Sequence, residues 1–227
     1  MNRIYLFAIL IAVASANFAV DIGNTAFSRQ TMKCLSNQNV SRVVLEISNE
    51  MGHINQDFLS GYIFAKDAGI STIDATVMVN DTSVAAEIST KIATALPTNF
   101  NGTIWLQIIN APQLWTQDIS RRIPYLEALV LVLKQNGVTA GVSADANTWV
   151  SIFGSQRAGS DTLKAAPVWY ANDNEVQSFD DFSYAGFGTW TQPTLKTYQN
   201  SVYLCGTMLG SLDYYEDKTR FNSIYLL

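Results

Sequence analysis

The sequence is poor in the residues that build metal centres and thiol active sites. It contains one histidine, His53, and two cysteines, Cys34 and Cys205. Zinc sites need several cysteine or histidine ligands and calcium sites need grouped carboxylates, and the sequence shows neither pattern. We therefore expect no metal and no other cofactor. His53 stands in the polar stretch "EMGHIN", which predicts a surface position, with a place in a ligand groove as the alternative.

An excess of positive charge is also missing. Fourteen Lys and Arg residues face nineteen Asp and Glu residues, which gives a formal net charge of −5. Proteins that bind phosphate backbones carry the opposite sign. Nucleic acid is therefore not expected as a partner.

Long apolar segments are missing after the first residues of the chain. Arg3 precedes an apolar run of about ten residues and then Ala14-Ser15-Ala16, a pattern typical of a cleaved signal peptide. The run is too short for a stable membrane anchor. We expect residues 1–16 to be a signal peptide and residues 17–227 to form one monomeric domain without a membrane anchor. Such a protein is secreted, either to the outside of the cell or into a lysosomal or phagosomal lumen.

The expected secretion bears on the oxidation state of the two cysteines. In an oxidising compartment an even number of cysteines favours a disulfide, so Cys34 and Cys205 are expected to pair. Two free buried thiols are the alternative. N-glycosylation sequons begin at Asn39, Asn80 and Asn101, in polar stretches beside predicted strands, which suits surface loops.

Short segments rich in apolar and β-branched residues recur along the chain and predict strands. They are residues 18–23, 42–48, 72–79, 103–109, 139–145, 167–172, 195–200 and 209–215. Helical spacing occurs between the first of them, for example over 83–96 and over 119–136, where Asn136-Gly137 supplies a stop. After Asp173 the sequence predicts no long helix. The pattern predicts an α/β fold, an irregular TIM-like (β/α)5(β)3 barrel in a single domain, with its groove at the C-terminal ends of the strands.

Side chains at the strand ends supply the candidate chemistry, because they converge on the open end of a barrel. Asp21, Glu46 and Asp213 come from strands that become neighbours when the barrel closes, and their mutual repulsion should raise at least one pKa. Aromatic and amide side chains suited to sugar rings and hydroxyls complete the set. They are Trp169, Tyr170, Asn172, Trp190, Tyr198, Gln199, Tyr214 and Tyr215. These residues predict a carbohydrate groove; the alternative is that many of the aromatic residues belong to the core.

Four blocks of sequence make the prediction more specific. They are "FAVDIG", "GVTAGVSADANTWVSIFG", "PVWYANDNEVQSFDDFSYAGFGTWTQPTLKTYQ" and "YLCGTMLGSLDYY". In these blocks the chain resembles the Chalaropsis-type lysozymes, glycoside hydrolase family 25, and in particular their small secreted animal and protist branch. The resemblance implies an incomplete (β/α)5(β)3 barrel that cleaves the β-1,4 bond between N-acetylmuramic acid and N-acetylglucosamine in bacterial peptidoglycan. It also implies a role in innate immunity, and it matches Asp21 and Asp213 to two acids of the family groove.

The fourth predicted strand departs from this family. The family motif there is Trp-x-Asp-x-Glu, with the Glu as general acid, whereas this chain has Trp105, Gln107 and Ile109. An alkyl side chain cannot deliver the proton that the leaving oxygen needs, and losing a general acid removes about 10²–10⁴-fold of the rate. We therefore expect a catalytically impaired, lysozyme-like protein that binds peptidoglycan or a related glycan.

The alternative is an active muramidase with a rearranged acid pair drawn from Asp21, Asp213 and Glu46. In that case Glu46 would supply the lost proton from the second strand. The simpler interpretation of Glu46 pairs it with a nearby arginine such as Arg42, or leaves it in solvent. Other family positions are changed too: Glu46-Ile47-Ser48 stands where relatives carry Arg-Ala-Tyr, and Ser143 replaces the tyrosine of the fifth strand.

Overall fold

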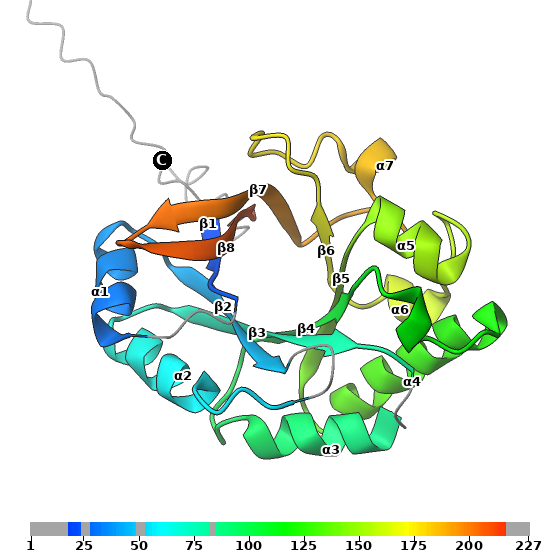
Figure 1. Ribbon diagram of the computed structural model, residues 1–227, viewed down its shortest axis with the longest axis horizontal. Coiled ribbons are helices and arrows are strands. Elements are labelled where there is room, and N and C mark those ends of the chain that lie inside the picture. Colours follow the sequence, from blue (N-terminus) through cyan, green and yellow to red (C-terminus); the bar gives the residue numbers. More distant parts are fainter. Residues whose placement is uncertain (1–17, 24–27, 49–52, 82–84, 217–227) are drawn as a thin grey trace, which may run out of the picture.

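The computed structural model describes residues 18–23, 28–48, 53–81 and 85–216. Within them, eight strands form a closed barrel in which the last strand lies beside the first (Figure 1). The strands are β1 (Phe18–Asp21), β2 (Arg42–Ser48), β3 (Thr72–Val79), β4 (Thr103–Ile108), β5 (Thr139–Asp145), β6 (Val168–Ala171), β7 (Leu195–Leu204) and β8 (Thr207–Tyr214). The predicted α/β barrel is confirmed, and every predicted strand segment forms a strand.

Helices lie on the outer side of the barrel (Figure 1). They are α1 (Arg29–Asn37), α2 (Phe58–Asp67), α3 (Ala85–Ala95), α4 (Arg122–Gln135), α5 (Ala146–Phe153), α6 (Asp161–Lys164) and α7 (Phe182–Ala185). Two 3-10 turns, Pro112–Leu114 and Ile119–Arg121, precede α4. The first five helices follow β1 to β5, as the sequence predicts. The two single-turn helices α6 and α7 are additions that the sequence pattern did not reveal.

Helix α4 shows how the local sequence sets these elements. Leu126, Leu129 and Leu133 recur at helical spacing and are all fully buried. The helix ends at Gln135, and Gly137 then takes a φ of +75°, a conformation that glycine adopts without a steric penalty. The helix therefore ends at the predicted stop signal, Asn136-Gly137.

Strand direction defines the two ends of the barrel. Strands β1 to β7 pair in parallel, whereas β8 is antiparallel to both β7 and β1. A two-residue turn at Cys205-Gly206 joins β7 to β8, and a connection this short can only produce an antiparallel pair. We call the end where β1 to β7 finish and β8 begins the mouth, and the opposite end the floor.

Alternation along each strand produces two separate cores. On β4, Ile104, Leu106 and Ile108 belong to the apolar layer between the barrel wall and the helices. Trp105 belongs instead to a second cluster inside the barrel, and Gln107 shares its side of the strand. The interior cluster is small, and the rest of the barrel interior is filled by polar side chains.

A buried ion pair occupies the floor of the barrel. Asp74 is fully buried, and its Oδ2 lies 2.9 Å from the Arg42 Nη2 and accepts a hydrogen bond from the Trp105 Nε1 at 2.9 Å. The Asp74 Oδ1 accepts from the backbone N–H of Thr103, and the Arg42 guanidinium lies over the ring of Tyr215. Asp74 thereby holds Trp105 in one orientation beneath the mouth.

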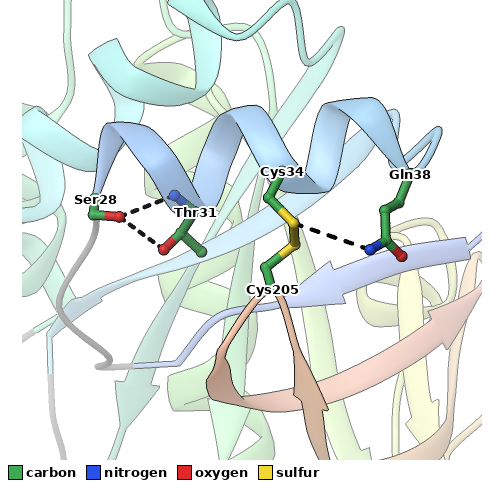
Figure 2. The surroundings of a disulfide bond; sticks show 5 residues. All are labelled: Ser28, Thr31, Cys34, Gln38 and Cys205. Atoms are coloured by element: carbon green, nitrogen blue, oxygen red, sulfur yellow. Dashed lines mark hydrogen bonds between the residues drawn. A yellow bond between two sulfur atoms is a disulfide. The ribbon is translucent and has the colours of Figure 1, made fainter.

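The expected disulfide is present. Cys34 and Cys205 are bonded with a Cα–Cα distance of 5.8 Å, and they join α1 to the turn between β7 and β8 (Figure 2). Cys34 lies within α1. The bond spans 171 residues, which in the chain-entropy model corresponds to about 5 kcal/mol of stabilisation.

Several other sequence predictions concern the surface. Asn39 and Asn101 are exposed and precede β2 and β4 at the floor end, whereas Asn80 is only partly exposed and follows β3 at the mouth. His53 is exposed. The predicted signal peptide lies outside the described residues. In the part of the chain that is described, the helices are too short or too polar to span a membrane.

We expect Asp74→Asn to lower the free energy of unfolding by about 3 kcal/mol, because the substitution leaves the Arg42 charge largely buried without its counter-ion. Urea denaturation monitored by tryptophan fluorescence measures this change. Asp67→Asn is the matched control, since Asp67 pairs with Arg29 on the surface and should contribute less than about 1 kcal/mol. Equal effects of the two substitutions would contradict the structural role of the floor ion pair.

We expect the protein secreted from a eukaryotic host to carry N-glycans at Asn39 and Asn101 and not at Asn80. The first two side chains reach solvent at the floor end, whereas Asn80 is partly enclosed at the mouth. Intact mass before and after enzymatic deglycosylation counts the glycans, and Asn→Gln variants assign them. A glycan on Asn80 would show that this side chain is more accessible than the structure indicates.

Candidate functional site

A cavity of about 190 Å³ opens at the mouth of the barrel. Polar side chains from five strands or their extensions line it: Asp21, Gln107, Ser143, Asp145, Asn200 and Ser211. Trp169 adds an aromatic surface. The cavity is smaller than the roughly 300–1,000 Å³ of sites for drug-sized ligands, so it fits a single ring or a group of that size.

A larger cavity of about 460 Å³ lies at the floor end, beside α4 and the start of β5. Its lining is mostly apolar, with Lys134 as its charged residue and no carboxylate among the residues described there. Grouped titratable side chains mark a functional site more reliably than volume does. We therefore place the candidate site at the mouth.

Two acids occupy adjacent strands at the candidate site. In the β1–β8 pairing, Asp21 lies opposite Ser211, and Asp213 lies opposite Ala19, one layer nearer the floor. The Asp21 Oδ1 accepts a hydrogen bond from the backbone N–H of Gly23 at 2.9 Å. Asp213 is fully buried, and its Oδ1 accepts from the hydroxyls of Thr197 at 2.6 Å and Ser211 at 2.9 Å.

Both acids hold their protons more tightly than usual. The pKa of Asp21 is raised to about 6. Burial is the largest cause, the hydrogen bond from the Gly23 N–H opposes it, and the nearby Glu46 charge adds a smaller upward contribution. Burial also raises the pKa of Asp213 well above its ordinary value, with the Asp21 charge as the second cause. The predicted repulsion among these carboxylates is confirmed, although burial is the larger effect in each case.

The Oδ2 atom of Asp213 is buried and has no hydrogen-bond partner among the described residues. A carboxylate oxygen left in this state carries a large desolvation cost. A proton on the carboxyl group lowers that cost because it removes the charge, which agrees with the raised pKa. Asp213 therefore provides a buried, hydrogen-bonded support beneath Asp21, in a position that disfavours its charged form.

Trp169 and Gln107 form the inner surface of the cavity. The Trp169 Nε1 donates to the Thr197 Oγ1 at 2.9 Å, and its ring meets Trp105 edge to face with centroids 5.6 Å apart. Trp105 is in turn fixed by Asp74 at the floor. Gln107 lines the cavity, and Ile109, two residues later, is partly exposed just beyond the end of β4.

Comparison with known proteins identifies the family. A family model described as "Lysozyme-like protein 1" matches residues 12–198. The "Probable GH family 25 lysozyme 2" of Dictyostelium discoideum is 30% identical over 203 residues, covering 88% of this chain and 92% of that protein. The chain belongs to the lysozyme-like proteins of glycoside hydrolase family 25.

Solved structures agree with this assignment at the level of the fold. The GH family 25 lysozyme from Aspergillus fumigatus superposes with a TM-score of 0.68 at 12% identity, covering 92% of this chain and 98% of that one. A muramidase from Trichobolus zukalii gives a TM-score of 0.70 at 14% identity, covering 92% and 98%. The barrel of this family is therefore present over nearly its whole length.

In this family 25 barrel, Glu46 is neither solvated nor the ion-pair partner found for Arg42. Glu46 is 8% exposed on β2, near the mouth, and its charge acts on Asp21. Arg42 lies four residues earlier on the same strand, at the floor, and forms its ion pair with Asp74. Four residues of strand span about 13 Å, too far for a direct contact between the two backbone positions. The expectation of a solvated Glu46 is therefore wrong, and the ion pair found for Arg42 is with Asp74.

Tyr170 and Asn172 support a loop and do not line the cavity. The Tyr170 hydroxyl donates to the Asp181 Oδ1, and the Asn172 Nδ2 donates to the Asp181 Oδ2. Lys196, fully buried, pairs with the same carboxylate at 2.9 Å and donates to the backbone carbonyls of Val176 and Ser178. Burial opposes ionisation of Asp181, yet these hydrogen bonds hold its pKa below the ordinary value. The network ties the connection from β6 to α7 down onto the barrel.

Trp190 and Tyr198 also fall outside the cavity lining. Trp190 packs against Trp149 and Phe187 in the outer core, and its Nε1 donates to the carbonyl of Ala166. Tyr198 is 4% exposed, and its hydroxyl accepts a hydrogen bond from the Gln177 side chain. Of the aromatic residues that the sequence suggested for sugar contacts, Trp169 is the one that the structure places at the cavity.

The direction of β8 explains why Tyr214 and Tyr215, which the sequence suggested for the groove, do not line the cavity. Because β8 runs from mouth to floor, Tyr214 and Tyr215 lie at the floor end, where Tyr215 contacts Arg42. Ser211, two residues before Asp213, reaches the cavity instead. Sequence reasoning also missed Thr197 and Asn200. Alternation from Leu195 would have suggested Thr197, whereas Asn200 lies on the same side only because the register of β7 shifts between Thr197 and Gln199.

We expect Asp21→Asn to make the protein more stable at pH 7 by about 1–3 kcal/mol, because the folded state disfavours the charge on Asp21. The folded pKa of Asp21 is about 6 and its ordinary value is 3.8, so the wild-type protein gains stability relative to the variant as pH falls between these values. Denaturation of both proteins at pH 4, 5, 6 and 7 measures the difference. A stability difference between the two proteins that does not change with pH would contradict the raised pKa of Asp21.

Proposed function

We propose that this protein is a secreted GH family 25 protein that binds the glycan of bacterial peptidoglycan and cleaves it poorly. The observation that carries the proposal is Gln107, a neutral amide lining the cavity where the family motif has a carboxylate. Ile109 occupies the motif position of the general acid and has no proton to donate. The fold, the cavity at the mouth and the family membership support a glycan ligand.

The chemistry of the cavity supports binding. Trp169 offers an apolar surface, while Gln107, Ser143 and Asn200 offer hydrogen-bonding groups from three different strands. Sugar rings combine an apolar face with hydroxyl and acetamido groups, and such mixed sites bind them. The ligand class is consistent with the printed names of the relatives, which are lysozymes and muramidases.

The disulfide and the predicted signal peptide support secretion. Structural disulfides persist in oxidising compartments, and Cys34 and Cys205 form one here. A secreted wall-binding protein suits a role in defence or digestion, acting as a monomer outside the cell or in a lysosomal or phagosomal lumen. This role is part of the proposal.

The second candidate function is an active muramidase, and one observation favours it. Asp21 has a pKa of about 6, a value suited to a general acid near neutral pH. Asp145 lines the same cavity from β5, which is four strands away in an eight-stranded barrel and therefore on the opposite wall. An acid and a second carboxylate facing one another across a bound sugar are what glycoside hydrolysis requires. Asp145, however, also caps α5 through the backbone N–H and hydroxyl of Thr148.

Restoring the family motif tests the proposal. We expect the double substitution Gln107→Asp with Ile109→Glu to clear a suspension of Gram-positive cell walls at least about 100-fold faster than the natural protein, because it returns a proton donor and a neighbouring carboxylate. Turbidity measures clearance, and sedimentation with insoluble peptidoglycan measures binding. Natural and restored proteins should bind the walls equally well.

Three outcomes distinguish the candidates. If only the restored protein clears the walls and both bind, the natural protein is a binder. If the natural protein clears them within about tenfold of the restored one, it is an enzyme, and Asp21→Asn and Asp145→Asn then identify its acids. If neither protein binds peptidoglycan, the proposed ligand is wrong.

A further inference from the structure

The hairpin formed by β7 and β8 reaches well beyond the barrel wall. β6 pairs with β7 only over Leu195 to Thr197, and β1 pairs with β8 only over Ser211 to Tyr214. We call residues 199–210 the arm. At its base Gln199 and Asn200 pair with Leu212 and Ser211, and beyond the barrel wall residues 202–204 pair with residues 207–209. Among the described strands, none flanks the arm on either side, so its position depends on other contacts.

A single covalent bond holds the tip of the arm. Cys205 and Gly206 form the turn with φ values of +55° and +78°, the left-handed pair typical of a tight hairpin turn. Cys205 is bonded to Cys34 in the middle of α1 (Figure 2). Near the tip, the side chain of Leu209 packs into the core, whereas Tyr203 and Met208 are 69% and 51% exposed. Leu204 and Cys205 also pack partly against this core, and the Asn200 Nδ2 donates to the Asp173 Oδ2 at 3.1 Å. Among these contacts of the arm, the disulfide is the covalent one.

The arm is also a wall of the candidate site. Asn200 and Gly210, one from each side of the arm, line the cavity together with Asp21. Gly210 lies so close to β1 that a Cβ added to it would be 3.3 Å from the Asp21 carboxyl carbon. A displacement of the arm therefore changes the shape of the cavity and the surroundings of Asp21 at the same time.

We propose that the Cys34–Cys205 disulfide is a redox-sensitive latch that holds the arm as the wall of the glycan site. A dithiol reductant opens the latch. One of its thiolates attacks a sulfur of the disulfide and releases the other cysteine as a thiol, and its second thiol then displaces the first cysteine. The products are two protein thiols and the oxidised reductant. With the latch open, the arm detaches from α1 while the barrel stays closed through β1, β8 and β7. The effect on binding rests on the proposed function, whereas the movement of the arm does not.

Hydrogen exchange of the intact protein tests the movement without any ligand. We expect amides of residues 199–210 to exchange at least tenfold faster after reduction with dithiothreitol, and in Cys34→Ser with Cys205→Ser, under conditions in which β2 to β5 remain protected. Leu133→Ala is the control, because it removes a buried side chain from α4 with the disulfide intact. This variant should unfold more easily and keep its arm protected. An arm that stays protected after reduction, or that exchanges equally fast in Leu133→Ala, would overturn the latch.

Sedimentation with insoluble peptidoglycan tests the consequence for the site. We expect the reduced protein, still folded by circular dichroism, to bind at least tenfold more weakly than the oxidised protein. Unchanged binding despite a mobile arm would overturn the claim that the latch controls the site. If the oxidised protein does not bind peptidoglycan, the proposed function fails instead, and hydrogen exchange alone then tests the latch. Faster exchange confined to the arm after reduction supports the latch, whereas faster exchange throughout the chain refutes it.

Discussion

The antiparallel closure of the barrel by β8 is the constraint on which the site depends. β8 is hydrogen-bonded to β1 on one side and to β7 on the other, so it completes the wall and removes both sheet edges. Its direction decides the depth at which each of its side chains lies. Ser211 reaches the cavity, Asp213 lies one layer below, and Tyr215 is at the floor beside Arg42.

The interior of the barrel is stabilised by polar groups in layers. At the floor, Asp74 neutralises Arg42 and fixes Trp105. Above it, Asp213 accepts hydroxyl hydrogen bonds and has a pKa raised well above its ordinary value by burial, and Asp21 lies at the mouth with its pKa near 6. The floor carboxylate is paired with a cation, whereas the two nearer the mouth are disfavoured in their charged forms. Such unfavourable burial is typical of sites that serve a ligand or a reaction and not stability alone.

The connection from β6 to α7 shows how strongly aromatic residues can mislead. Tyr170 and Asn172 come from the block that most specifically carries the family resemblance, yet both donate to Asp181 inside the protein. Lys196 joins them from β7 with its side chain fully buried. An aromatic residue followed by an amide has the same pattern whether it binds a sugar or supports a loop, and only the partner across the fold distinguishes the two.

The sequence by itself determined the strands, the long helices, the α/β barrel and the pairing of Cys34 with Cys205, because these follow from local periodicity, stop signals and the oxidising compartment that the N-terminus predicts. It also revealed Gln107 and Ile109, since a motif position can be read without coordinates. The tertiary structure decided which side chains meet. It placed Trp169 at the cavity and Trp190 in the outer core, and it paired Arg42 with Asp74. The physical reason is that periodicity reports which face of an element is buried, whereas depth, strand direction and partners depend on segments far apart in the chain.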